Sequence, residues 1–394
     1  MSAQLRRKVT STRRRLPAFV LVLVVAALCI AGVIYKGAEV TQVNVNDGGI
    51  WVTNKSKQMV GHLDYEAHIL DGALRTEATN FDVGQAGETV TVSDLISLTV
   101  APVNVTQVSL GSPTALPSGS SAMQGGDVLG VLNPTDGTLW TTSATAPSPA
   151  NLSEGAALSS NMGTSAFVTG LDGSVYSLAA SGTLTTVKRQ GTVDQAATAR
   201  IEGIPEDAQL SITVVGDQVV ALDSQSNALF LPGGKKLDLG AAGVEEGGIL
   251  QLAGPKADSV LLATPSALVS IPLAGGTPTI TPATESGVSG NPAAPVRHEG
   301  CAYGAWSVSG AYMRACDDPS ANKQMVVDTL TTARDIVFRT NRKAIVLNDV
   351  AQGSVWLPDS NMFLMDNWDE VENQLEESED DQDDPELTNE FADP

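Results

Sequence analysis

The chain has 394 residues, a formal net charge of −22 and only 17% charged residues. This acidic balance disfavours nucleic-acid binding, because an acidic surface repels the phosphate backbone. The residues after position 40 are enough for one large all-β domain or two smaller ones.

Residues 16–35 form the only apolar run of membrane-spanning length. A helix of this run, LPAFVLVLVVAALCIAGVIY, would span about 30 Å, which matches the hydrocarbon thickness of a bilayer. We therefore predict a single transmembrane helix. A cleaved signal peptide is the alternative, but its apolar region would be shorter and would end at a small-residue cleavage site.

The charge before this run predicts its orientation. No acid occurs before Glu39, and positive charge stays on the cytoplasmic side of a membrane. Residues 1–15 are therefore predicted to form a basic cytoplasmic tail, and everything after residue 35 is predicted to lie outside. The membrane-orienting residues are Arg6, Arg7, Lys8, Arg13, Arg14 and Arg15.

A short phrase recurs between residues 40 and 365. It combines a turn rich in Asp, Asn or Gly with a strand that carries an aliphatic or aromatic residue, as in NPTDGTLWTTS (133–143), GLDGSVYSLA (170–179) and AQGSVWLPD (351–359). Asp-Gly steps suit tight hairpin turns, and the alternation that follows suits a half-buried strand. The predicted core anchors are Trp51, Trp140, Tyr176, Phe230, Val269, Trp306 and Trp356.

The spacing of these anchors predicts a β-propeller over residues 40–365. Seven intervals of about 44 residues fill the distance from Trp51 to Trp356, if one further unit lies within residues 81–100. Units of this length with several short strands are typical of propeller blades. If the first and last copies share one blade, the ring has about seven blades, with six or eight as alternatives. Two β-sandwiches would also show frequent turn signals.

Cys301 and Cys316 are the only cysteines outside the apolar run. They flank a predicted hairpin, CAYGAWSVSGAYMRAC, so we predict a disulfide between them, with two free thiols as the alternative. A disulfide persists in an oxidising compartment, which agrees with export.

The C-terminal segment 366–394 contains fourteen acidic residues and no basic residue. It has few apolar groups to bury, so we predict a disordered acidic linker.

No motif for catalysis or metal binding stands out. The chain has three histidines, His62, His68 and His298, and it lacks HExxH, zinc-ligand, P-loop, GxSxG and dinucleotide-binding patterns. We therefore predict no catalytic residues, no cofactor and no metal, and a protein that is not an enzyme.

The basic tail, the tract VTQVNVNDGGIWVTNKSKQMVGHLD and the DGTLW and DGSVY hairpins resemble a family. It is the N-terminal ectodomain of large membrane-anchored surface proteins of actinobacteria. In that family a propeller-like region precedes tandem immunoglobulin-like or fibronectin type III domains. This sequence stops at Pro394, where the family pattern would continue, so it would be either a truncated form or a stand-alone version. The resemblance implies surface display and protein interaction, and no catalytic residues.

Together these features predict a single-pass cell-surface protein whose extracellular propeller is a scaffold or adhesion module. Its partner would be an extracellular protein or glycan. The alternatives are an extracellular propeller hydrolase or lyase that acts on glycans, and an extracellular sensor domain.

Overall fold

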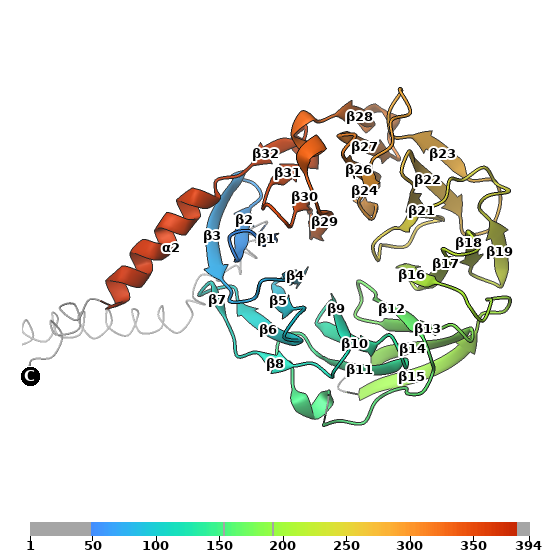
Figure 1. The fold of residues 1–394 in the computed structure, drawn as a ribbon, viewed down its shortest axis with the longest axis horizontal. Coiled ribbons are helices and arrows are strands. Elements are labelled where there is room, and N and C mark those ends of the chain that lie inside the picture. The colour runs from blue at the N-terminus through green and yellow to red at the C-terminus, as the bar shows by residue number, and fades with distance from the viewer. Residues whose placement is uncertain (1–48, 153, 191–192, 384–394) are drawn as a thin grey trace, which may run out of the picture. The chain divides into compact units, whose positions relative to one another are not determined.

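The computed structural model describes residues 49–152, 154–190 and 193–383. These residues form eight antiparallel sheets arranged in a ring, so the prediction of an all-β propeller is confirmed (Figure 1). The basic tail 1–15 and the predicted transmembrane helix 16–35 lie outside the described residues. Within the described ranges, no helix is long and apolar enough to cross a membrane.

The first four sheets, blades 1 to 4, follow one another in chain order. Blade 1 contains β1 (Ile50–Asn54), β2 (Met59–Asp64) and β3 (Ile69–Arg75). Blade 2 contains β4 (Phe81–Ala86), β5 (Thr89–Asp94), β6 (Thr99–Asn104), β7 (Ser109–Leu110) and β8 (Thr114–Ala115). Blade 3 contains β9 (Ser121–Gly125), β10 (Val128–Asn133) and β11 (Thr138–Ser143), followed by η1 (Pro149–Asn151). Blade 4 contains β12 (Ser165–Thr169), β13 (Val175–Ala179), β14 (Thr183–Gln190) and β15 (Val193–Arg200).

Blades 5 to 8 complete the ring. Blade 5 contains β16 (Leu210–Val215), β17 (Gln218–Asp223), β18 (Ala228–Leu231) and β19 (Lys235–Asp238). Blade 6 contains β20 (Ile249–Leu250), β21 (Ser259–Ala263), β22 (Ala267–Pro272) and β23 (Thr279–Pro282). Blade 7 contains β24 (Asn291–Pro292), β25 (Val296–His298), β26 (Cys301–Ser307), β27 (Ala311–Cys316), η2 (Pro319–Ala321) and β28 (Lys323–Val326). After η3 (Asp328–Thr332), blade 8 contains β29 (Ile336–Asn341), β30 (Ala344–Asp349), β31 (Val355–Leu357), η4 (Pro358–Ser360) and β32 (Phe363–Met365).

The prediction of about seven blades is wrong, because the first and last copies of the repeat do not share a blade. Trp51 lies on β1 in blade 1, whereas Trp356 lies on β31 in blade 8. The further unit expected within residues 81–100 is present as β4 and β5 of blade 2. Each copy of the repeat therefore marks its own blade, and the ring has eight.

The recurring turn has a common structure at the end of the second strand of a blade. An Asn or Asp side chain accepts a hydrogen bond from a backbone N–H two or three residues later, which is an Asx-type turn. The fourth residue of the turn has a positive φ, for example 54° at Gln58 and 71° at Gly137. The capping residues are Asn54, Asp94, Asn133, Asp223 and Asp349.

The predicted anchors fill the spaces between blades. Trp51, Tyr176, Phe230, Val269, Trp306 and Trp356 are buried, whereas Trp140 is half-buried on β11. The two buried indoles of blades 7 and 8 also find acceptors. Trp306 Nε1 donates to Thr264 O at 2.7 Å, and Trp356 Nε1 donates to Thr329 Oγ1 at 2.9 Å.

The predicted disulfide between Cys301 and Cys316 is confirmed. These residues are direct cross-strand neighbours in β26 and β27. The bond therefore ties together the ends of one hairpin in blade 7.

The prediction of a disordered linker over 366–394 is wrong for its first part, because α2 (Trp368–Asp383) is a helix whose start packs on β3 (Figure 1). Trp368 and Val371 are buried in the core of blade 1, and Leu375 packs against the same core. Their spacing places these three residues on one apolar face of the helix. The segment is so rich in acidic residues that its composition does not reveal this face. Residues 384–394 lie outside the described residues.

Candidate functional site: the seam between blades 8, 1 and 2

Blade 1 has no strand on the inner side of β1 among the described residues. β1 corresponds to a second strand, because it ends in Asn54 and is followed by the recurring turn. The N–H groups of Lys55 and Ser56 in this turn donate to Val350 O and Ala351 O in the matching turn of blade 8, at 2.9 and 3.2 Å. The first strands of blades 8 and 2, β29 and β4, therefore approach each other beside blade 1.

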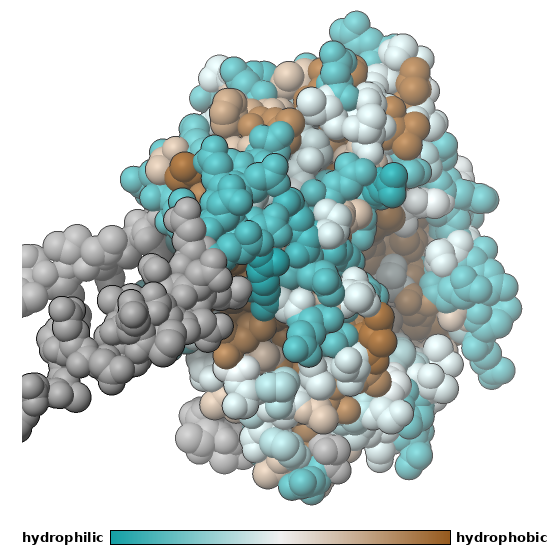
Figure 2. Space-filling view, turned by 60° about the vertical axis from the view of Figure 1, so that its left-hand side comes forward, coloured by the Kyte–Doolittle hydropathy of each residue, from teal (hydrophilic) through white to brown (hydrophobic). Residues whose placement is uncertain are grey.

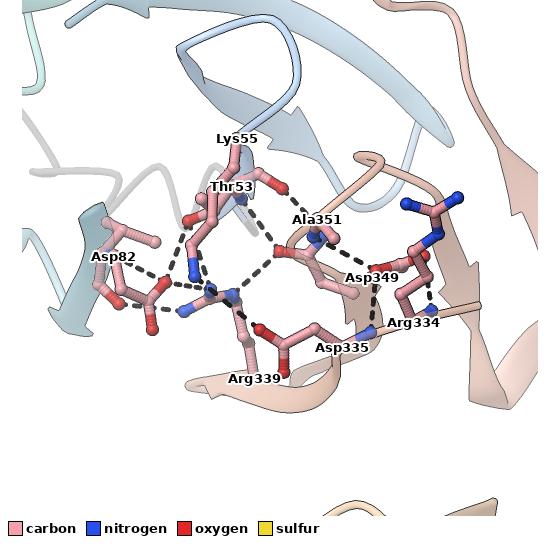
Figure 3. Close-up of polar contacts among 10 residues, drawn as sticks. Thr53, Lys55, Asp82, Arg334, Asp335, Arg339, Asp349 and Ala351 are labelled. Carbon is pink, nitrogen blue, oxygen red and sulfur yellow. Dashed lines mark hydrogen bonds and ion pairs between the residues drawn. The ribbon is translucent and has the colours of Figure 1, made fainter. Parts of the chain in front are cut away.

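Arg339 on β29 connects the three blades (Figure 3). Its guanidinium forms an ion pair with Asp82 of β4 and donates to Val83 O at 2.9 Å. It also donates to Thr53 Oγ1 at 3.2 Å and to Asn348 Oδ1 at 3.1 Å. The Arg339 side chain is only 9% exposed. One buried cation thus bonds to strands of blades 8, 1 and 2.

Among the described residues, side-chain amides take the place of a further strand along the inner edge of β1. Trp51 N donates to Gln85 Oε1 of blade 2 at 2.9 Å, and Thr53 N donates to Asn348 Oδ1 of blade 8 at 2.9 Å. Asn348 Nδ2 returns a hydrogen bond to Thr53 O at 3.1 Å. These bonds satisfy buried backbone groups that would otherwise destabilise the fold.

A third amide, Asn341, closes the seam at the end of β29. Its Nδ2 donates to Gly49 O at 2.8 Å and to Gly87 O at 3.2 Å, while its Oδ1 accepts from Gly87 N at 2.8 Å. Nearby, Arg342 Nη2 pairs with Glu88 at 3.1 Å. Blades 8 and 2 are therefore in direct contact at the hairpins that follow their first strands.

Two further carboxylates lie at the opposite end of β29 (Figure 3). Lys55 Nζ is 3.7 Å from Asp335, which is more than half exposed. Asp349 is fully buried and accepts from the backbone N–H groups of Arg334, Asp335 and Ala351, each at 3.1 Å. The Lys55–Asp335 pair ties the β1–β2 turn to the start of β29, and the Asp349 bonds hold the β30–β31 turn against the same segment.

The charged groups of the seam form hydrogen bonds within the protein and join neighbouring blades. Arg339 makes four kinds of hydrogen bond, and Asp349 already accepts three backbone bonds. A general acid or base needs to be within reach of a substrate proton, and these groups are engaged by the protein itself. The arrangement stabilises the contact between blades.

A second feature is a rim of acidic hairpin tips. In five blades, the turn between the first and second strands carries an exposed carboxylate, and the rim acids are Glu88, Asp127, Asp172, Asp217 and Glu299. Neighbouring hairpins are close enough that a Cβ at Gly126 would lie 3.5 Å from Leu171 O, and one at Gly216 would lie 3.1 Å from Lys256. The turns of blades 3 and 4, and those of blades 5 and 6, are therefore neighbours, and we call the five acids the rim acids.

The histidines singled out in the sequence do not converge. His62 Nδ1 lies 2.6 Å from Asp71, His68 Nε2 lies 3.3 Å from Ser360, and His298 Nε2 lies 2.9 Å from Lys343 O. Within the part of the chain that the structure describes, no three His, Cys, Asp or Glu residues are grouped to hold a metal ion.

Sequence reasoning missed the seam residues. Their only signal is a polar side chain inside an apolar strand, as with Arg339 in IVFRTN and Asn348 in AIVLND. Apart from Asn348, the partners of Arg339 are separated from it by more than 250 residues, so no local pattern identifies them.

No family model and no curated protein matches this sequence. Among solved structures, the chain is similar to the dihydro-heme d1 dehydrogenase NirN in complex with DHE, with a TM-score of 0.51 and 12% identity over 81% of this chain and 72% of that one. It is also similar to BamB from Moraxella catarrhalis, with a TM-score of 0.48 and 15% identity over 78% and 90% of the two chains. At these identities the likeness concerns the fold alone.

Proposed function

We propose that this protein is a non-enzymatic scaffold that binds a partner through its propeller. The observation that carries this proposal is the seam itself, where the hydrogen bonds of the Arg339 guanidinium join blades 8, 1 and 2. A rigid ring that holds loops in fixed positions suits recognition, since binding residues are commonly found on loops of a stable framework.

The acidic rim is the surface that we assign to partner binding. Glu88 already pairs with Arg342, but the exposed carboxylates of Asp127, Asp172, Asp217 and Glu299 would favour a partner protein with a basic patch, because complementary charge speeds and orients association. Figure 2 shows a surface in which hydrophilic areas separate several small hydrophobic patches. Recognition by the rim carboxylates would be polar, because charged groups bind their partners through ion pairs and hydrogen bonds.

We also propose that residues 16–35 anchor the propeller outside the cytoplasmic membrane, with residues 1–15 in the cytoplasm. The Cys301–Cys316 disulfide supports export, since such bonds persist in oxidising compartments. Trypsin treatment of intact cells tests this topology. Peptides from 49–383 should be released while the N-terminal tail stays protected, and release only after cell lysis would contradict it.

Chemical crosslinking on intact cells tests the binding role. The variant Asp127→Asn/Asp172→Asn/Asp217→Asn removes three rim charges, and Asp136→Asn/Glu206→Gln removes exposed charges from turns at the opposite ends of the strands. We expect the rim variant to lose a crosslinked partner that the wild type and the control retain. Equal crosslinking by all three proteins, or turnover of a glycan or lactone by the purified protein, would contradict the proposal.

A further inference from the structure

Arg297 is a half-buried cation between blades 6 and 7. It lies on β25, and its Nη2 donates to the Ser259 hydroxyl on β21 at 2.5 Å. Ser259 Oγ also accepts from Ser270 Oγ at 2.9 Å. Nε of Arg297 is buried without a hydrogen-bond partner, whereas Nη1 has no partner among the described residues and faces solvent. The guanidinium therefore bonds to the described protein through one neutral hydroxyl.

The other half-buried arginines of the described ranges each have a carboxylate partner. The pairs are Arg189 with Asp194, Arg314 with Asp359, and Arg339 with Asp82. Burial lowers the pKa of Arg297, and the more distant charge of Asp317 offsets this effect only in part. Arg297 thus differs from the other three because the described chain supplies no anion in contact with it.

An unpaired, half-buried cation indicates an anionic ligand. Burial of a charge without a partner is costly, and proteins usually offset this cost with an opposite charge. A guanidinium carries only hydrogen-bond donors, so the ligand must be an acceptor. Nη1 and the second N–H of Nη2 form the planar fork that binds an oxygen anion through two parallel hydrogen bonds.

The acids around Arg297 favour a ligand with a single negative charge. Glu299 is exposed on the same hairpin, two residues after Arg297. The carboxylate of Asp317 lies against the tip of that hairpin, since its Oδ2 would be 3.2 Å from a Cβ at Gly300. These acids would repel a phosphate dianion about twice as strongly as a carboxylate, because the repulsion is proportional to the ligand charge. The favoured ligand class is therefore a carboxylate.

We propose that Arg297 binds a single carboxylate group between blades 6 and 7. The carboxylate can come from an Asp or Glu side chain of a partner protein or from a free small molecule, because the same fork recognises both. The site goes beyond the acidic rim and does not depend on the binding role proposed for it.

Arginine labelling of the full-length protein in detergent tests this site. Phenylglyoxal reacts with accessible arginines, and peptide mass spectrometry follows the modification of Arg297. We expect about 100 mM sodium acetate to slow this modification at least about threefold relative to sodium chloride of equal ionic strength, which corresponds to a Kd of about 50 mM or lower. Inorganic phosphate should protect Arg297 less than acetate. The exposed Arg334 is the control and should react equally fast in all three salts. Equal labelling of Arg297 in acetate and chloride would overturn the proposal.

Arg297→Met separates a ligand site from a structural role. Because the described chain gives Arg297 no carboxylate, its removal should leave the midpoint of urea unfolding in chloride unchanged or higher. Acetate should raise the midpoint of the wild type by more than that of Arg297→Met, since a ligand that binds only the folded state stabilises it. Asp317→Asn removes a competing negative charge and should make acetate protect Arg297 more strongly. A lower midpoint for Arg297→Met, or an equal response of both proteins to acetate, would contradict the assignment.

Crosslinking on intact cells identifies the source of the carboxylate. We expect Arg297→Met to lose the crosslinked partner that the wild type retains, which assigns the carboxylate to the partner protein. A retained partner, with acetate protection of Arg297 in the wild type, assigns it to a free small molecule. The rim variant should keep acetate protection of Arg297, because its substituted acids lie in blades 3, 4 and 5. Absence of acetate protection in the wild type together with rim-dependent crosslinking would reject the Arg297 site alone.

Discussion

Arg339 and Asp82 form an ion pair between the first strands of blades 8 and 2, although blade 1 lies between these blades in the ring. The pair can form because blade 1 has no inner strand among the described residues. The first and last blades of the propeller meet at this seam, and side chains hold them together there. In a ring closed by one shared blade, backbone hydrogen bonds within that sheet would do this instead. This explains why polar residues occur in otherwise apolar strands of blades 8 and 2.

Gln85→Leu should destabilise the fold, because it leaves the buried N–H of Trp51 without its acceptor. We expect a loss of about 1–3 kcal/mol in the free energy of unfolding, measured by urea denaturation. Gln107→Leu, in an exposed turn of blade 2, is the matched control and should change stability by less than about 0.5 kcal/mol. Equal stabilities of the two variants would contradict the role assigned to Gln85.

Trp368→Ala should release α2 from blade 1. Trp368 is 3% exposed, its Nε1 donates to Gly353 O at 2.6 Å, and its ring fills the space above Gly61. Removal of such a side chain costs about 3–5 kcal/mol. Limited proteolysis should then cleave within 368–383 before any other described segment. Glu370→Gln, at an exposed position of the same helix, should leave the cleavage pattern unchanged.

Reduction of the Cys301–Cys316 disulfide should lower stability by about 3 kcal/mol, because the bond closes a short loop across 15 residues. Denaturant unfolding with and without reductant measures this difference. Cys301→Ser/Cys316→Ser should match the reduced wild type and should not respond to reductant. An unchanged unfolding midpoint for the wild type under full reduction would contradict the prediction.

Asp223 should make stability depend on pH in the acid range. Its burial raises its pKa, but hydrogen bonds from the Ser226 hydroxyl and from the N–H groups of Gln209 and Gln225 hold the pKa below its usual value. Because the unfolded value is about 4, the carboxylate contributes stability above about pH 4, and this is lost as the pH falls through the folded-state pKa.

The variant Asp223→Asn tests this dependence. We expect it to be about 1–3 kcal/mol less stable than wild type at pH 7, with a difference that shrinks below about pH 4. Asp217→Asn, at an exposed hairpin tip, should resemble wild type at both pH values. A difference that stays constant between pH 7 and pH 3 would contradict this assignment.

The sequence predicts much of this fold because its repeat is local. Each copy combines an Asx or glycine turn with the strand that follows, and residues such as Trp306 and Trp356 mark blades through their size alone. The disulfide was also predictable, since Cys301 and Cys316 are the only cysteines outside the apolar run 16–35 and flank one hairpin.

The blade number and the seam were not predictable in this way. Whether Trp51 and Trp356 share a blade depends on ring closure, which no local pattern encodes. Arg339 and Asp82 lie 257 residues apart, and neither belongs to a recognisable motif. The acidic composition likewise hid α2, because only three apolar residues, Trp368, Val371 and Leu375, pack it against the core, while acids of the same helix pair with Lys57 and Arg75.

The most direct test of this account asks whether the charged cluster of the seam is structural. A double-mutant cycle of Arg339→Met and Asp82→Asn measures the coupling between the two residues in the free energy of unfolding. We predict that Arg339→Met costs about 2–3 kcal/mol and that the coupling exceeds about 1 kcal/mol, because one ion pair and its hydrogen bonds link the blades. Additive effects within about 0.5 kcal/mol, or an Arg339→Met protein as stable as wild type, would contradict the claim.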